Sequence, residues 1–189
     1  RNYTFLLFIF MLIGCTSSSK KEELHDAKVT EKKFPKLTEG NYNVAFLIMD
    51  GTFNTELTAP FDIFQHTIFR EGIRPMNVFT VANSDAPTTT FEGMKIVPDF
   101  NYLKDQLPKI DILVVPSAEH HLDTDLEDEA MIQFVQRAAK EATFITSHCD
   151  GAFVLAKAGL LKDKIATTFP GDIDKRRVMF QELDIRKKV

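Results

Sequence analysis

The feature that most constrains this chain is an abrupt strand-to-helix turn centred on Cys149. Residues 143–146 are predicted as a short buried strand, 147–151 as a tight turn, and 152–158 as a helix closed by Gly159. Such a turn lifts a nucleophilic side chain clear of the sheet. The helix N-terminus behind it supplies backbone N–H groups and a positive dipole end, which favour a thiolate. The alternative interpretation is a Cys that serves as a small buried hydrophobe.

From residue 42 onward, predicted strands and helices alternate along the chain. The predicted strands are 44–49, 78–82, 110–115, 143–146 and 165–168, with a hairpin at 91–97, and the predicted helices are 57–69, 127–140, 152–158 and 173–183. Continuous apolar strands are typical of parallel sheets covered on both faces. The alternation predicts an α/β fold with a doubly wound, mostly parallel sheet. In such sheets ligands bind beyond the carboxyl ends of the strands.

Composition narrows the classes of partner. The chain has 189 residues, 44% of them apolar, and a formal charge of −4, which fits one ordinary domain and gives no basic surplus for nucleic acid. His120 and His121 stand beside Glu119 and Asp123. Adjacent residues rarely point at one ion and no second ligand motif accompanies them, so we expect no metal, and no cofactor of another kind.

The first residues predict export and lipidation. An apolar run at 3–13 is about the length of a signal-peptide core and short for a membrane span. It ends in Leu12-Ile13-Gly14-Cys15, which resembles a bacterial lipobox and implies cleavage before Cys15 and lipidation of its thiol. An uncleaved anchor and an ordinary signal peptide remain the alternatives. Residues 1–15 are thus assigned to the signal peptide, 16–41 to a flexible linker and 42–189 to the domain. The predicted location is the bacterial cell envelope, as a membrane-anchored lipoprotein that is periplasmic or surface-exposed.

Several separated segments, in order, resemble one family. They are residues 44–48, Asp50-Gly51, 56–64, 111–116, and Cys149-x-Gly151 through 158–161. Over about 42–182 the chain is similar to the ThiJ/PfpI (DJ-one/PfpI) superfamily of class I glutamine amidotransferase-like proteins. The resemblance implies a flavodoxin-like sheet. It also implies that the sequence stops before the C-terminal strand and helix with which family members usually continue.

The resemblance implies roles for individual residues. Cys149 is the reactive thiol and Glu56 the acid that hydrogen-bonds it, although Glu56 could also be a simple helix N-terminal acid. The backbone N–H groups of Ala118 and Asp150 are the expected oxyanion donors. Two positions depart from the family, because Asp150 and Phe169 stand where many members have His.

Other residues at the predicted strand ends are candidates for the pocket wall. They are Asp50, Gly51, Ser117, His120, His148 and Phe169. The leading hypothesis is a cysteine-dependent hydrolase or lyase that hydrates or hydrolyses a small electrophile, similar to isonitrile hydratases or to glyoxalases and deglycases. The second is a non-catalytic ligand-binding or redox-sensing domain. The expected partners are a small molecule, the membrane through lipid on Cys15, and a second copy of the chain in a homodimer.

Overall fold

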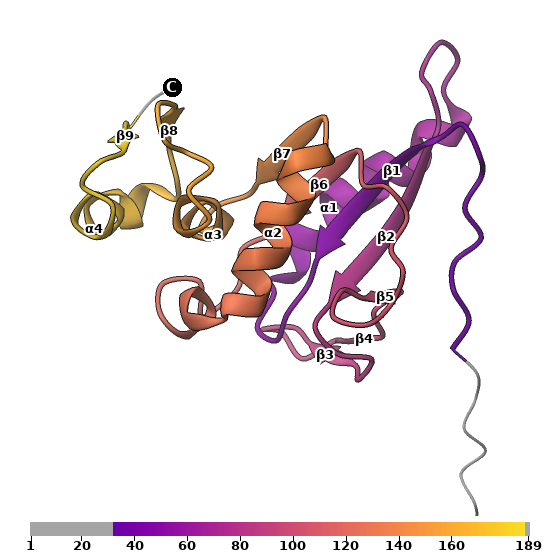
Figure 1. Cartoon of the computed structure of the whole chain (residues 1–189), viewed down its shortest axis with the longest axis horizontal. Helices are drawn as coiled ribbons and strands as arrows, with labels where there is room; N and C mark the ends of the chain where they lie inside the picture. Colours follow the sequence, from indigo (N-terminus) through magenta and orange to yellow (C-terminus); the bar gives the residue numbers. More distant parts are fainter. Residues whose placement is uncertain (1–31, 188–189) are drawn as a thin grey trace, which may run out of the picture. The chain divides into compact units, whose positions relative to one another are not determined.

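Five parallel strands form the central sheet of this protein, in the order β5-β2-β1-β6-β7 (Figure 1). The structure is a computed structural model and describes residues 32–187. The strands are β1 (Tyr42–Leu47), β2 (Met76–Ala82), β5 (Phe100–Asn101), β6 (Ile112–Val115) and β7 (Phe144–Ser147). Two short strands, β3 (Thr88–Thr89) and β4 (Lys95–Ile96), pair as an antiparallel hairpin. The predicted doubly wound α/β fold is confirmed.

Helices cover both faces of the sheet because alternate strand residues point to opposite sides. Ala45 and Leu47 of β1 belong to the core under α2 (Glu129–Glu141) and α3 (Gly151–Lys157). Val44 and Phe46 belong to a second core, in which they pack with Leu57 of α1 (Asn54–Gln65). The continuous apolar run of β1 is therefore explained by burial of both its faces.

Helix α1 begins directly beyond β1 and carries Glu56 in its first turn. The Glu92 carboxylate accepts a hydrogen bond from the Asn54 backbone N–H at 3.0 Å, so an acid from the hairpin satisfies one free amide at the helix start. Pro60 lies inside the helix and has no N–H to offer the carbonyl of Glu56. The 3₁₀ turn η1 (His66–Phe69) extends α1, and together they occupy the predicted helical region 57–69.

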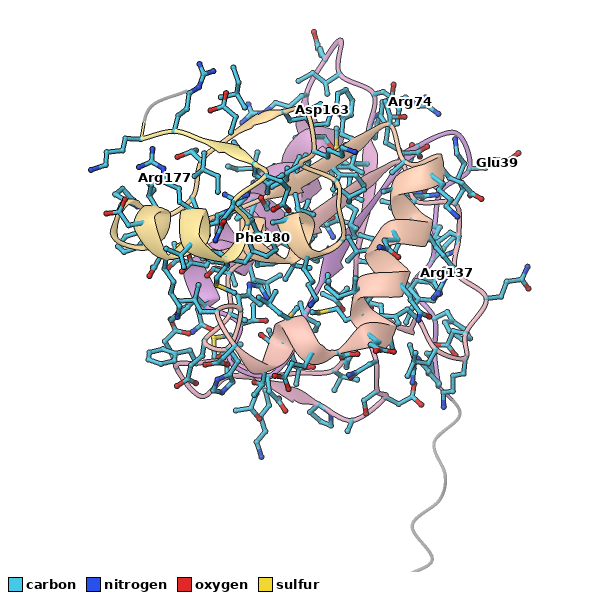
Figure 2. All side chains as sticks on the ribbon, turned by 60° about the vertical axis from the view of Figure 1, so that its left-hand side comes forward. Glu39, Arg74, Arg137, Asp163, Arg177 and Phe180 are labelled. Carbon is cyan, nitrogen blue, oxygen red and sulfur yellow. The ribbon has the colours of Figure 1, made fainter. Side chains whose placement is uncertain are left out.

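The C-terminal segment packs behind the elbow helix. It contains β8 (Ile165–Ala166), η3 (Pro170–Asp172), α4 (Ile173–Met179) and β9 (Asp184–Ile185), and β8 pairs with β9 in parallel. The ring of Phe180 meets that of Phe153 edge-on at 6.3 Å, and the Arg177 guanidinium donates to the carbonyl of Ile185 at 2.7 and 3.0 Å (Figure 2). The Phe180 contact ties the segment to α3, and the Arg177 hydrogen bonds join α4 to β9 within the segment.

Three features differ from the sequence-based expectation. Strand β5 was not predicted, and β7, predicted as buried, lies at the sheet edge with Phe144 60% exposed. Residues 33–41, assigned to the linker, pack on the domain, because Phe34 stacks on Phe100 and Leu37 contacts the core. The signal peptide and most of the linker lie outside the described residues. Between residues 32 and 187, no helix has the length and apolarity needed to cross a membrane.

Candidate functional site

Cys149 occupies a strained turn between β7 and α3. Its φ is 47°, a left-handed conformation that residues with a side chain seldom adopt. The backbone N–H of His148 donates to the Val115 carbonyl at 3.1 Å, and that of Gly151 donates to the His148 carbonyl at 2.9 Å. A Cβ on Gly151 would lie 2.2 Å from the Val115 carbonyl oxygen, so only glycine allows α3 to start this close to β6. The predicted strand-to-helix turn is therefore present, and the backbone of Cys149 is held in a single conformation within it.

The thiol of Cys149 is half-buried, and its surroundings oppose ionisation. Burial raises the pKa of the Cys149 thiol, and the negative charges of Asp150 and Glu56 raise it further. The Asp150 backbone N–H and the Ser117 hydroxyl act in the opposite direction. Of these two groups, the Ser117 hydroxyl lowers the pKa of the thiol more. The expectation of a depressed thiol pKa is thus wrong for this structure, since burial and two carboxylates outweigh the start of a seven-residue helix.

Asp150 is held by a polar cluster that the sequence did not reveal. The Thr168 hydroxyl lies 3.0 Å from both the Asp150 carboxylate and the Cys149 carbonyl oxygen. Burial raises the pKa of the Asp150 carboxyl, and the nearby Asp172 carboxyl raises it further. Arg176 is fully buried below the elbow and donates to the backbone carbonyls of Thr167 and Ala152. This cluster fixes the turn that carries Cys149.

Glu56 faces the elbow from α1. Its carboxylate Oε2 lies 3.7 Å from Nδ1 of His148, and its charge reaches the Cys149 thiol. Both Glu56 and Cys149 line a cavity of about 320 Å³, together with Ser147, Ala152, Thr167, Thr168, Phe169 and Pro170. The structure thus brings Glu56, His148 and Phe169 together around Cys149. Within residues 32–187, Glu56 acts on the thiol through its charge and not through a hydrogen bond between its carboxylate and the thiol.

The two expected oxyanion donors are both engaged. The Ala118 backbone N–H donates to Nδ1 of the fully buried His121 at 3.2 Å, so it is not free to bind an oxyanion in this conformation. The Asp150 backbone N–H serves the Cys149 sulfur. When the Cys149 sulfur forms a bond to a substrate, the Asp150 backbone N–H would become free to bind the oxyanion of an intermediate. The Ala118 N–H could bind this oxyanion only if its hydrogen bond to His121 broke.

Asp50 and His120 belong to a different cavity. Both line a space of about 270 Å³ at the ends of β1 and β2, together with Ser84, Asp125 and Asp128. Gly51 is needed for its positive φ of 78° and its contact with Glu119. Over residues 32–187, no group of three or more His, Cys, Asp or Glu side chains is placed to hold a metal ion. These three candidates therefore lie apart from the lining of the Cys149 cavity.

Comparison with known proteins places this geometry in a family. The sequence profile of the DJ-1/PfpI family matches residues 42–181. An isonitrile hydratase from Pseudomonas putida is 29% identical over 125 residues, which are 66% of this chain and 51% of that protein, so the chain spans about half the length of this curated relative.

Solved structures agree with the fold. A THiJ/PfpI family protein from Pseudomonas syringae has a TM-score of 0.62 at 24% identity, over 80% of this chain and 63% of the other. Drosophila melanogaster DJ-1beta has a TM-score of 0.64 at 16% identity, over 79% and 75%. The strand-to-helix elbow, the parallel sheet and the profile match agree, and the chain belongs to the DJ-1/PfpI family.

Proposed function

We propose that this protein uses Cys149 to hydrate or hydrolyse a small electrophile, and that an isonitrile is the substrate class it fits best. The observation that carries the proposal is that Cys149, in its strained turn, and Glu56 both line one cavity of about 320 Å³. The similarity to an isonitrile hydratase supports the choice of substrate. A glyoxalase-like or deglycase-like reaction on an α-oxoaldehyde is the related alternative within the same chemistry.

The cavity wall favours a neutral substrate. No Lys or Arg is among the described residues that line it, while Glu56 contributes a carboxylate and Phe169 an apolar ring that is 51% exposed. A substrate carboxylate would meet no cation here and would face the charge of Glu56. An isonitrile carries no charge, and its apolar substituent can lie against Phe169.

The reaction can be written with groups that surround the cavity. The Cys149 sulfur adds to the terminal carbon of the isonitrile, and the same carbon takes up one proton, which gives a thioimidate. Water then adds to this carbon, a proton moves to nitrogen, and the carbon–sulfur bond breaks. The products are an N-substituted formamide and the free thiol, so one water is consumed. Glu56 is the carboxyl group placed to give and take these protons.

Turnover should be slow in the native protein. Acid–base help from a side chain is worth about 10²- to 10⁴-fold in rate, and neither family His position carries His here. Phe169 lines the cavity, so Phe169→His would place an imidazole on its wall. We expect this variant to gain turnover, measured as formamide formed per enzyme per minute. A native protein that turns over quickly and is slowed by Phe169→His would show that Phe169 shapes a working pocket.

The direct test incubates the protein with a small alkyl isonitrile and measures the formamide by mass spectrometry. Cys149→Ser should abolish product, while His120→Gln, a change in the other cavity, should leave the rate unchanged. A parallel assay with an α-oxoaldehyde tests the related reaction. Product formed equally by Cys149→Ser would contradict the proposal. Thermal stabilisation by these compounds without product would instead favour the non-catalytic ligand-binding alternative.

We also propose that Cys15 is lipidated and anchors the domain to the bacterial cell envelope. The apolar run and the Leu12-Ile13-Gly14-Cys15 sequence support this proposal. Residues 1–15 lie outside the described residues, and the folded domain begins at Lys33. Residues 16–32 would then form the tether between the lipid and the domain.

A further inference from the structure

His148 holds a fixed position beside Glu56. Its backbone N–H and carbonyl are both hydrogen-bonded, to Val115 and Gly151, so the residue cannot move without opening the elbow. From this position its Nδ1 lies 3.7 Å from Oε2 of Glu56. The two side chains are partly exposed, at 36% for His148 and 30% for Glu56, so water can exchange protons with the pair.

The charges around the Cys149 thiol are unevenly balanced. Two carboxylates act on it, Glu56 from α1 and Asp150 from the elbow itself. Asp150 has compensation, because it interacts with the Thr168 hydroxyl and with the positive charge of Arg176 on α4, while Asp172 of η3 adds an acid beside it.

Glu56 lacks a comparable set of partners. Among residues 32–187, its one ion pair is with His148. Ser117, which approaches the thiol from the end of β6, carries no charge. When His148 is protonated, a thiolate at Cys149 would form beside an ion pair of Glu56 and His148 whose net charge is zero. When His148 is neutral, the thiolate would form beside the uncompensated negative charge of Glu56.

We propose that protonated His148 neutralises Glu56 and thereby permits the Cys149 thiolate to form. His148 is a positioning residue in this scheme, since it acts on the sulfur through Glu56. The inference rests on the proposed function only in taking Cys149 as the nucleophile. It gives this chain a source of positive charge at a position that precedes the Cys, whereas the His positions of the resembling families are occupied by Asp150 and Phe169.

The test is the pH dependence of Cys149 alkylation by iodoacetamide, a neutral reagent that needs no substrate turnover. His148→Gln keeps a hydrogen-bonding side chain but removes the positive charge. We expect the alkylation rate to fall about threefold to tenfold between pH 7 and pH 5, where an imidazole can carry its proton, and to change little near pH 9, as for one uncompensated charge near the protein surface. His148→Lys restores a cation and should return the rate toward that of the native protein.

A second background shows whether the effect passes through Glu56. In a Glu56→Gln protein, His148→Gln should change the alkylation rate at pH 5–7 by much less than it does in the native background. His120→Gln is the matched control, because it removes a half-exposed His that lies beside Glu119 and Asp123 and lines the other cavity, and it should leave the alkylation rates unchanged. Folding of every variant is checked by circular dichroism.

Two results would overturn the inference. One is an unchanged alkylation rate from pH 5 to pH 7 in folded His148→Gln, and the other is an equal loss of rate with and without Glu56. The outcome is separable from the proposed function. A loss of alkylation rate at pH 5–7 in His148→Gln, in a protein that forms no formamide, would leave the His148 role standing and remove the isonitrile reaction. Turnover without that loss of rate would do the reverse.

Discussion

Asp125→Asn should make this protein sensitive to acid, because Asp125 and His121 cancel each other's proton uptake. Burial lowers the pKa of His121 to about 4 from an ordinary 6.5 and raises the pKa of Asp125 to about 6 from 3.8. Nε2 of His121 lies 3.7 Å from Oδ2 of Asp125. Between pH 4 and pH 6, His121 and Asp125 together hold one proton in the folded protein, whichever of the two carries it. In the unfolded chain the two residues also hold one proton together, on His121. The pair therefore contributes little to the pH dependence of stability.

The substitution leaves His121 alone in its buried position. Below pH 6.5 the unfolded chain then takes up a proton that the folded protein refuses until about pH 4, so the free energy of unfolding falls as the pH falls through this window. The lowered pKa corresponds to about 3 kcal/mol over the full window and to about 2 kcal/mol at pH 5, because each pH unit is worth about 1.4 kcal/mol.

Urea unfolding at pH 7, 6 and 5 would measure this effect as the difference between variant and native protein. Taking the difference cancels the groups that both proteins share. Asp163→Asn is a matched control, because Asp163 is exposed and its positive φ of 58° suits Asn. A variant whose stability runs parallel to that of the native protein from pH 7 to pH 5 would refute the reasoning, and a variant that gains stability in acid would reverse it.

Three further predictions concern the elbow and the N-terminus. Gly151→Ala should cost about 1–3 kcal/mol in the free energy of unfolding, because the new Cβ overlaps the Val115 carbonyl, and an unchanged urea midpoint would mean that β6 yields freely. Asp150→Asn removes a charge that raises the pKa of Cys149 but keeps the backbone donor, so the midpoint of alkylation should fall, and a rise would contradict this account. Cys15→Ser should abolish labelling by a fatty-acid probe, and equal labelling of both proteins would refute lipidation there.

The fold could be predicted largely from the sequence because its central strands are buried on both faces. The apolar runs that became β1 and β6 carry this signal directly. Strand β5 has two residues, which is too short for any periodicity. The exposure of Phe144 could not be read from an apolar segment either, since an edge strand and a central strand share the same residue types.

The elbow around Cys149 could be predicted from a local turn, and Glu56 was named only through the resemblance to the family. The raised thiol pKa could not be predicted, because it depends on burial and on the way the fold brings Glu56 near Cys149, beside the charge of Asp150. The contact between Ala118 and His121 also has no signal in the sequence, because it depends on how one loop folds back on itself. Arg176 lies 27 positions after Cys149 in a polar stretch, and only the packing of α4 places it below the elbow.

A raised thiol pKa is compatible with the hydration we propose. Addition to an isonitrile places both the sulfur and one proton on the same carbon. A thiol that is mostly protonated before the reaction therefore already supplies this proton, and a small population of thiolate slows the reaction little. A sulfur of higher pKa is also the more nucleophilic once ionised. The limiting requirement is then a local charge that allows brief ionisation, which is the role assigned to His148 acting on Glu56. A thiolate that persisted at neutral pH would instead favour oxidation, in keeping with the redox-sensing alternative.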